Sequence, residues 1–203
     1  MKKKIAIYLA GSIQKAHEEN DSHWSEQDIG NLKELLSDYE ISILNPALRS
    51  DDLSDQRSVF GRDMLQVYCC NFVFVDARGR CGLGVGAEMM WAKLNAIPVI
   101  TLSPKNTHYN KSVTSLLGTR VENWIHPFIE SLSDCVAENL AEGASWINTA
   151  VNNRSMPIKS IEQIHESMRY YHENQLTYDI PMQEVLMSNI DLSIRIKSIN
   201  PSS

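Results

Sequence analysis

The chain has 203 residues, of which 43% are hydrophobic and 22% are charged, and its formal net charge at pH 7 is −6. These values are typical of a globular protein with room for one α/β domain and an appendage. A net negative charge without a basic stripe argues against a polymeric nucleic-acid ligand. A free nucleotide needs only a few local donors and stays compatible with the composition.

The four cysteines, at positions 69, 70, 81 and 135, form no CxxC pair and fit neither a disulfide framework nor a zinc site. We therefore expect reduced thiols in a cytoplasmic protein, with no metal and no other cofactor. No stretch approaches the roughly 20 apolar residues of a membrane-spanning helix, so no membrane association is expected.

Short apolar runs alternate with amphipathic segments over the first hundred residues. The apolar runs predict strands at 4–11, 40–46, 71–76 and 97–104. The amphipathic segments predict helices at 22–38, 54–69 and 84–96. This alternation predicts parallel βαβ units, and hence an α/β fold class with a doubly wound parallel sheet and helices on both faces.

The pattern weakens after Pro104. Helices expected at about 110–117 and 131–147 would complete a first domain, residues 1–150. Residues 151–203 are expected to form a C-terminal helical extension or oligomerisation arm, with one more helix at 160–175.

Four segments follow the predicted strands at the carboxyl edge of the sheet, where open parallel sheets bind ligands. They are GSIQ, NPALR, DARGRCGLG and SPKN. The third leads into a predicted helix that carries Glu88 in its first turn, after Gly82, Gly84 and Gly86. A helix N-terminus stabilises a carboxylate by about 0.3–1 kcal/mol, which makes acids common there. An ionised, fixed carboxylate is also what a nucleophile at a sugar carbon requires.

Asp63 and Tyr8 each permit two interpretations. Asp63 lies four residues from both Val59 and Val67, on or beside the apolar face of its predicted helix. It can pair with Arg62, Arg57 or a neighbouring helix, or it can meet Glu88 at the edge of the sheet. Tyr8 can be an ordinary core tyrosine of the first strand or part of the same site.

Four motifs occur in a recognisable order over residues 4–104: IYLAGSI (7–13), RDMLQVYCCNFVFVD (62–76), GLGVGAE (82–88) and AIPVI (96–100). In this order the chain resembles the nucleoside 2-deoxyribosyltransferase superfamily, which includes nucleoside and nucleotide N-glycosidases. The resemblance implies a flavodoxin-like fold and cleavage of the bond between base and sugar.

The resemblance assigns Glu88 as the nucleophile that attacks the anomeric carbon. Asp63 would hold sugar hydroxyls or help to protonate the departing base, and Tyr8 would orient the nucleophile or the sugar. The pocket would be lined by Gly11, Ser12, Ile13, Gly82, Gly84 and Gly86. The reaction would then retain configuration and pass through a glycosyl-enzyme ester.

One position departs from the family pattern. Transferases carry aspartate six residues before the glutamate and monophosphate glycosidases carry serine, whereas this chain has Gly82. Loss of the aspartate favours hydrolysis over base exchange. Loss of the serine weakens the case for a phosphate ligand unless Ser12, Arg78 or Arg80 compensates.

The resemblance further implies a pocket completed by a neighbouring subunit, with Asn110 and Ser112 as candidates, and hence a homodimer or higher homo-oligomer. The expected substrate is a small nucleoside or nucleoside 5′-monophosphate. Three alternatives stay open: a nucleoside 2-deoxyribosyltransferase, an NAD glycohydrolase and a non-catalytic nucleotide-binding sensor.

Overall fold

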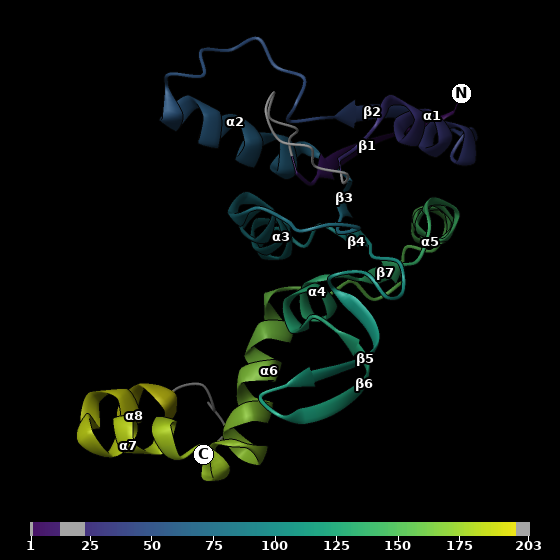
Figure 1. The fold of residues 1–203 in the computed structure, drawn as a ribbon. Helices are drawn as coiled ribbons and strands as arrows, with labels where there is room; N and C mark the ends of the chain where they lie inside the picture. The colour runs from purple at the N-terminus through teal and green to yellow at the C-terminus, as the bar shows by residue number, and fades with distance from the viewer. Residues whose placement is uncertain (1, 13–22, 198–203) are drawn as a thin grey trace. The chain divides into compact units, whose positions relative to one another are not determined.

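The computed structural model describes residues 2–12 and 23–197, and the described chain forms two units that divide between Lys159 and Ser160 (Figure 1). The first unit contains a five-stranded sheet made of β1 (Lys3–Ala10), β2 (Tyr39–Leu44), β3 (Phe72–Asp76), β4 (Val99–Leu102) and β7 (Cys135–Ala137). Its helices are α1 (Glu26–Leu35), α2 (Gln56–Cys69), α3 (Leu83–Leu94), α4 (Pro127–Leu132) and α5 (Leu140–Asn152). It also contains a separate antiparallel hairpin of β5 (Asn110–Leu116) and β6 (Thr119–Ile125).

The sheet has the strand order β2-β1-β3-β4-β7, and every pair in it is parallel. This is the flavodoxin order 2-1-3-4-5, in which the order of the strands reverses beside the first strand. Helices α1 and α5 cover one face of the sheet, and α2 and α3 cover the other (Figure 1). The α/β, flavodoxin-like fold expected from the sequence is therefore confirmed.

The predicted helix at 110–117 is wrong, because this segment is strand β5 of the hairpin. Its partner, β6, lies directly after a two-residue turn at Leu117 and Gly118, whose φ angles are 48° and 86°. Positive φ at both central residues is the conformation that matches the twist of a tight hairpin. The β-branched Val113 and Thr114 favour the strand once this partner is available.

The predicted helix at 131–147 is also wrong, because a strand interrupts it. Helix α4 ends at Leu132, β7 pairs with β4 through Ile100 and Cys135, and α5 begins only at Leu140. Asn139 caps α5 by accepting a hydrogen bond from the Glu142 amide at 2.9 Å. Pairing with the exposed edge of β4 outweighs the helical preference of the intervening residues.

Alternation along β1 separates the core from the candidate site. Ile5, Ile7 and Leu9 belong to the hydrophobic core that also contains residues of α1 and α5. Because successive side chains of a strand point to opposite faces, Tyr8 points to the face that α2 and α3 cover. Tyr8 is completely buried there.

A buried ion pair between Lys93 and Asp134 fastens α3 to the sheet, and both side chains are almost inaccessible to solvent. Asp134 also accepts hydrogen bonds from the backbone amides of Val99 at 2.7 Å and Lys159 at 2.6 Å. This one carboxylate therefore connects α3, β4 and the segment that ends the first unit.

The second unit is helical and comprises α6 (Ile161–Asn174), the 3₁₀ turn η1 (Leu176–Tyr178), α7 (Ile180–Ser188) and α8 (Ile190–Lys197). No residue of α6, η1 or α7 is buried. Its exposed apolar side chains include Met168, Tyr170, Tyr178, Ile180, Met187, Ile190 and Ile194. None of the described helices of the chain is both long and apolar enough to cross a membrane.

Two helical glycines give opposite expectations for alanine substitution. A Cβ at Gly143 of α5 would overlap the ring of Phe74, which is completely buried, whereas a Cβ at Gly30 of α1 has nothing within 4 Å. We expect Gly143→Ala to destabilise the protein by about 1–3 kcal/mol through overpacking. Gly30→Ala should stabilise it by about 0.5–1 kcal/mol through helix propensity. Urea denaturation followed by circular dichroism measures both, and a Gly143→Ala variant as stable as the wild type would contradict the packing.

Candidate active site

A hydrogen bond between Tyr8 and Glu88 joins the first strand to helix α3 on the face that α2 and α3 cover. The Tyr8 hydroxyl donates to Glu88 Oε1 at 2.8 Å, and Glu88 is 8% exposed. Burial, the negative charge of Glu88 and the hydrogen bond to it all raise the pKa of Tyr8, so the phenol stays protonated and acts as a donor. Tyr8 is therefore both a core residue and a hydrogen-bond donor to the Glu88 carboxylate.

The second carboxylate oxygen, Glu88 Oε2, is buried and accepts no hydrogen bond from the described residues. An unpaired buried carboxylate oxygen is costly in a folded protein, because water no longer solvates it. Tyr8 thus holds one oxygen in place, while the other keeps its lone pairs available.

Glu88 lies in the second turn of α3, which corrects the expectation that it lies in the first. The helix begins at Leu83 with Gly82 as its N-cap, and its first turn contains no acid. The helix terminus therefore does not set the ionisation of Glu88. Burial raises the pKa of Glu88 to about 7, against the lowering effect of the Tyr8 hydrogen bond and with a smaller raising effect from Asp63.

Asp63 of α2 lies between arginines, so the ion-pair interpretation is confirmed for Arg62. Its Oδ1 lies 3.5 Å from Arg62 Nη1 and 3.6 Å from Arg49 Nη1. Burial raises the pKa of Asp63, and the two arginines oppose that rise. Asp63 also acts electrostatically on both Tyr8 and Glu88, although no hydrogen bond joins it to either of them in the described structure.

From the sequence, loop 47–57 either borders the base of a ligand or is an ordinary solvated loop, and its contact with Asp63 through Arg49 was not predicted. The Arg49 side chain is only 10% exposed and forms two hydrogen bonds with Asp51, at 2.9 and 2.5 Å. The ion pair between Arg49 and Asp63 connects the loop after β2 to α2. The sequence contains no signal that this loop lies against α2, so the contact between Arg49 and Asp63 could not be predicted from it.

Gly11 and Ser12 follow β1 and line a cavity of about 220 Å³ at the carboxyl edge of the sheet. The other described lining residues are Leu9, His23, Trp24, Asn45, Pro46 and Ala47. Residues of the predicted segments after β1 and β2 thus line this cavity. Tyr8, Asp63 and Glu88 are not among its described lining residues. Ile13, also predicted to bind substrate, lies outside the described residues.

The hydroxyl of Ser12 donates to the carbonyl of Arg80 at 2.9 Å. This bond brings the end of β1 beside the loop that precedes α3. It connects two of the four segments that the sequence placed at the same edge.

Gly82, Gly84 and Gly86 surround the start of α3 without any structural need for glycine. None of them has a positive φ angle, and a Cβ at Gly82 or Gly86 would meet nothing within 4 Å. A Cβ at Gly84 would meet Glu88 Oε1 at 3.8 Å, an ordinary contact distance. The three glycines therefore add no side chains of their own at the start of α3.

Asn110 and Ser112 lie on β5, and within the described part of the chain neither of them forms a hydrogen bond with Glu88. Asn110 is buried and donates from Nδ2 to the Ser103 carbonyl at 2.8 Å, which fixes the loop after β4. The amide of Ser112 donates to Asn106 Oδ1 at 3.1 Å. Within one chain these two residues therefore stabilise the hairpin, and a role in a neighbouring pocket stays a proposal.

The described residues contain no cluster of three or more histidines, cysteines or acids placed to hold a metal ion. All four cysteines are free thiols. The candidate site described above thus consists of carboxylates, a phenol, arginines and backbone groups.

Comparison with known proteins identifies the fold. No protein-family model matches the chain, and no curated protein does either. The structure is similar to that of a conserved protein from Enterococcus faecalis V583, with a TM-score of 0.50 and 18% identity, over 73% of this chain and 99% of that one. It also matches the CMP N-glycosidase BcmB of Clostridium botulinum, with a TM-score of 0.38 and 13% identity, over 70% of this chain and 98% of that one.

Because Glu88 is buried, the free energy of unfolding should depend on pH, whether or not the protein is an enzyme. The pKa of Glu88 is about 7 in the folded protein against an ordinary 4.5, so the folded state binds this proton more tightly than the unfolded chain does. The contribution of Glu88 to stability is therefore complete below pH 4.5 and is lost as the pH rises through 7. Because glutamine mimics the protonated acid, Glu88→Gln should exceed the wild type in stability by up to about 3 kcal/mol near pH 8.5.

Urea denaturation of both proteins across this pH range measures the difference, which should vanish near pH 4. A Glu88→Gln variant that is no more stable than the wild type at every pH would show that the carboxylate is solvated.

Proposed function

We propose that the protein cleaves the N-glycosidic bond of a nucleoside or a nucleoside 5′-monophosphate, with Glu88 as the nucleophile. The observation that carries this proposal is the buried Glu88 carboxylate, whose Oε1 is held by Tyr8 while Oε2 accepts no hydrogen bond from the described residues. A carboxylate with one oxygen fixed and one available is suited to attack at a sugar carbon.

The reaction would proceed in two displacements with overall retention of configuration. Glu88 Oε2 attacks the anomeric carbon, the bond between that carbon and the base nitrogen breaks, and the base leaves with a proton. Water then attacks the same carbon from the opposite side, releases the pentose and restores the carboxylate. With a pKa of about 7, Glu88 is partly ionised at neutral pH, and its poor solvation leaves the ionised form reactive.

Tyr8 orients the nucleophile through its hydrogen bond and lowers the pKa of Glu88 against the effect of burial. Asp63 lies close enough to influence Glu88 electrostatically, and Arg49 and Arg62 favour its ionised form. As a carboxylate it can accept hydrogen bonds from sugar hydroxyls. It can assist the departing base only if it first takes up a proton, for which its raised pKa provides the opportunity.

The pocket would include the backbone of Gly11 and the hydroxyl of Ser12, which follow β1, and we assign Ile13 to it as well. The lack of side chains at Gly82, Gly84 and Gly86 supports a sugar at the start of α3. Gly82 in place of the aspartate of transferases supports water over a second base as the acceptor.

We also propose that the chain forms a homodimer or a higher homo-oligomer, in which Asn110 and Ser112 serve the pocket of a neighbouring subunit. The second unit supports this proposal, because its described helices α6 and α7 bury no residue and expose many apolar side chains. A small helical unit without a core of its own gains stability by packing on another surface.

Release of free base tests the activity. We expect the wild type to release free base from at least one member of a panel of ribo- and deoxyribonucleosides and their 5′-monophosphates. Chromatography of the reaction mixture measures the free base. Glu88→Gln should lower the rate by at least about 10³-fold, because an amide cannot form the glycosyl ester. Glu26→Gln, which removes an exposed acid of α1, is the matched control and should retain the wild-type rate.

No base release from any member, or undiminished release by Glu88→Gln, would refute the glycosidase proposal. Adding a second free base to the assay distinguishes a transferase, and nicotinamide release from NAD distinguishes an NAD glycohydrolase. Tight binding of a nucleotide that is recovered intact would instead favour a sensor.

The pH profile tests the role of Tyr8. The low-pH limb of kcat/KM should follow ionisation of Glu88, near pH 7 in the wild type. Tyr8→Phe removes the hydrogen bond that lowers this pKa, so the limb should move to higher pH by about one unit or more. A Tyr8→Phe profile that is uniformly lower without a shift would mean that Tyr8 does not interact with the ionising group.

A further inference from the structure

Positive charge is concentrated in the segments that follow β3 and β4. Residues 77–121 contain six lysines and arginines but a single acid, Glu88, in a chain whose net charge is −6. Both segments leave the carboxyl ends of central strands, where open parallel sheets bind their ligands.

Ion pairs account for three of these six cations: Arg78 pairs with Asp76 and Asp28, Lys93 with Asp134, and Arg120 with Glu122. Arg80, Lys105 and Lys111 form no ion pair with a carboxylate in the described part of the chain. Lys105 instead donates to Asn123 Oδ1 at 3.3 Å.

The pairing of Arg78 answers a question that the sequence left open. Its guanidinium donates to Asp76 and Asp28 and to the carbonyl of His23, and it lies 6.0 Å from the ring centre of Trp24. Asp76 is almost completely buried, so this arrangement is structural. Arg78 is not available to compensate for the serine that Gly82 replaces, whereas Arg80 is.

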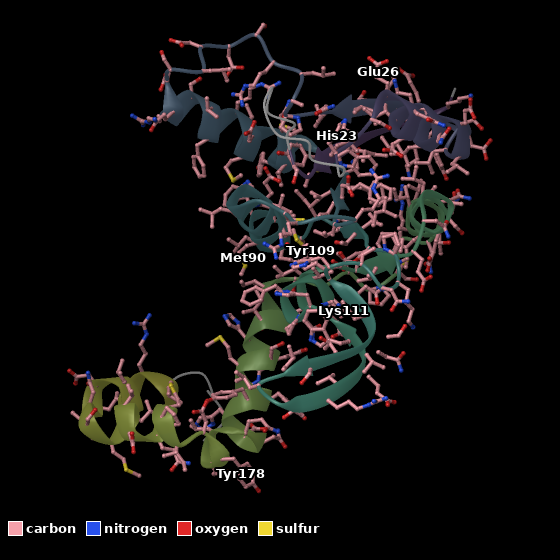
Figure 2. All side chains as sticks on the ribbon, in the orientation of Figure 1. His23, Glu26, Met90, Tyr109, Lys111 and Tyr178 are labelled. Atoms are coloured by element: carbon pink, nitrogen blue, oxygen red, sulfur yellow. The ribbon has the colours of Figure 1, made fainter. Side chains whose placement is uncertain are left out.

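The structure brings Arg80 next to the base of the hairpin. The amide of Cys81 donates to the Tyr109 hydroxyl at 3.0 Å, and the His108 and Tyr109 rings meet edge to face with centroids 4.6 Å apart. Lys111 lies two residues after Tyr109 (Figure 2). Its Nζ lies 5.8 Å from the ring centre of Trp124. Burial and then the charges of Arg80, Lys111 and His126 lower the pKa of His108, so these groups lie close enough to act on its imidazole.

The same loop adjoins the candidate nucleophile. The carbonyl of Arg80 accepts the hydrogen bond of Ser12. Burial and then the charge of Asp76 raise the pKa of the adjacent Cys81 thiol to about 11, and Glu88 adds a smaller rise. The cluster of Arg80, His108 and Lys111 therefore belongs to the edge of the sheet at which Glu88 would act.

We propose that Arg80, His108 and Lys111 form an anion subsite that binds the phosphate of a nucleoside monophosphate, a proposal that rests on the proposed function. The positive charges of Arg80 and Lys111 would attract an anion bound beside His108. The planar guanidinium of Arg80 can bind two phosphate oxygens, while Lys111 supplies a point charge. The subsite would make the monophosphate, and not the nucleoside, the preferred substrate.

Charge-neutralising variants test this subsite. The values of kcat/KM are measured for one nucleoside and its 5′-monophosphate with wild type, Arg80→Gln, Lys111→Gln and Arg120→Gln. Loss of one charged hydrogen bond to phosphate should lower kcat/KM for the monophosphate by roughly 10-fold to 100-fold, and that for the nucleoside by less than about threefold. Arg120→Gln removes an exposed cation of the same hairpin that already pairs with Glu122, and it should change neither value.

Equal effects of Arg80→Gln on nucleoside and monophosphate would overturn the subsite and leave the glycosidase proposal intact. If the wild type releases no base from either compound, the glycosidase proposal fails, and calorimetry then tests the subsite alone. Monophosphate should bind wild type at least about 10-fold more tightly than nucleoside does, and Arg80→Gln should abolish that difference.

Two further calorimetric arms distinguish the source of the phosphate. Inorganic phosphate binding as tightly as the monophosphate would overturn the assignment to a nucleotide. A single-stranded oligonucleotide that binds more tightly than the monophosphate, in a manner sensitive to Arg80→Gln, would likewise overturn it in favour of a polymer.

Discussion

The hydrogen bond between Tyr8 and Glu88 is the interaction on which the candidate site depends. It joins strand β1 to helix α3 at a point where both side chains are buried. A single phenol does not replace the water that an ionised carboxylate loses on burial, so the ionised form of Glu88 is destabilised. Its pKa is raised, and its Oε2 accepts no hydrogen bond from the described residues. Natural proteins retain such a cost mainly where the group performs a function.

The fold explains how this cost is sustained. Alternation along β1 directs Ile7 and Leu9 into the core on one face and Tyr8 to the other. Helices α2 and α3 deliver Asp63 and Glu88 to that second face, while the buried pair of Lys93 and Asp134 fixes α3 at its opposite end. The three glycines before Glu88 add no side chains of their own to the start of α3.

The sequence was sufficient to predict those helices and strands that are determined by a local pattern of residues. The continuous apolar runs of β1 and β3 and the amphipathic pattern of α6 are found where they were predicted, because each pattern repeats over many residues. It was insufficient where a distant partner decides. Residues 110–116 become a strand because 119–125 pairs with them, and the three residues of β7 become a strand because the edge of β4 is free.

The candidate site followed the same division. The types and order of Tyr8, Asp63 and Glu88 were readable from the sequence, whereas the enclosure of Asp63 by Arg49 depends on how a loop folds back onto α2. The most direct test of the central claim is mass spectrometry of an acid-quenched reaction with a 2′-fluoro substrate analogue, which slows release of the sugar. We predict a pentosyl mass increment on the peptide that contains Glu88, absent from Glu88→Gln. Base release with inverted anomeric configuration and no adduct, or an adduct on another residue, would contradict it.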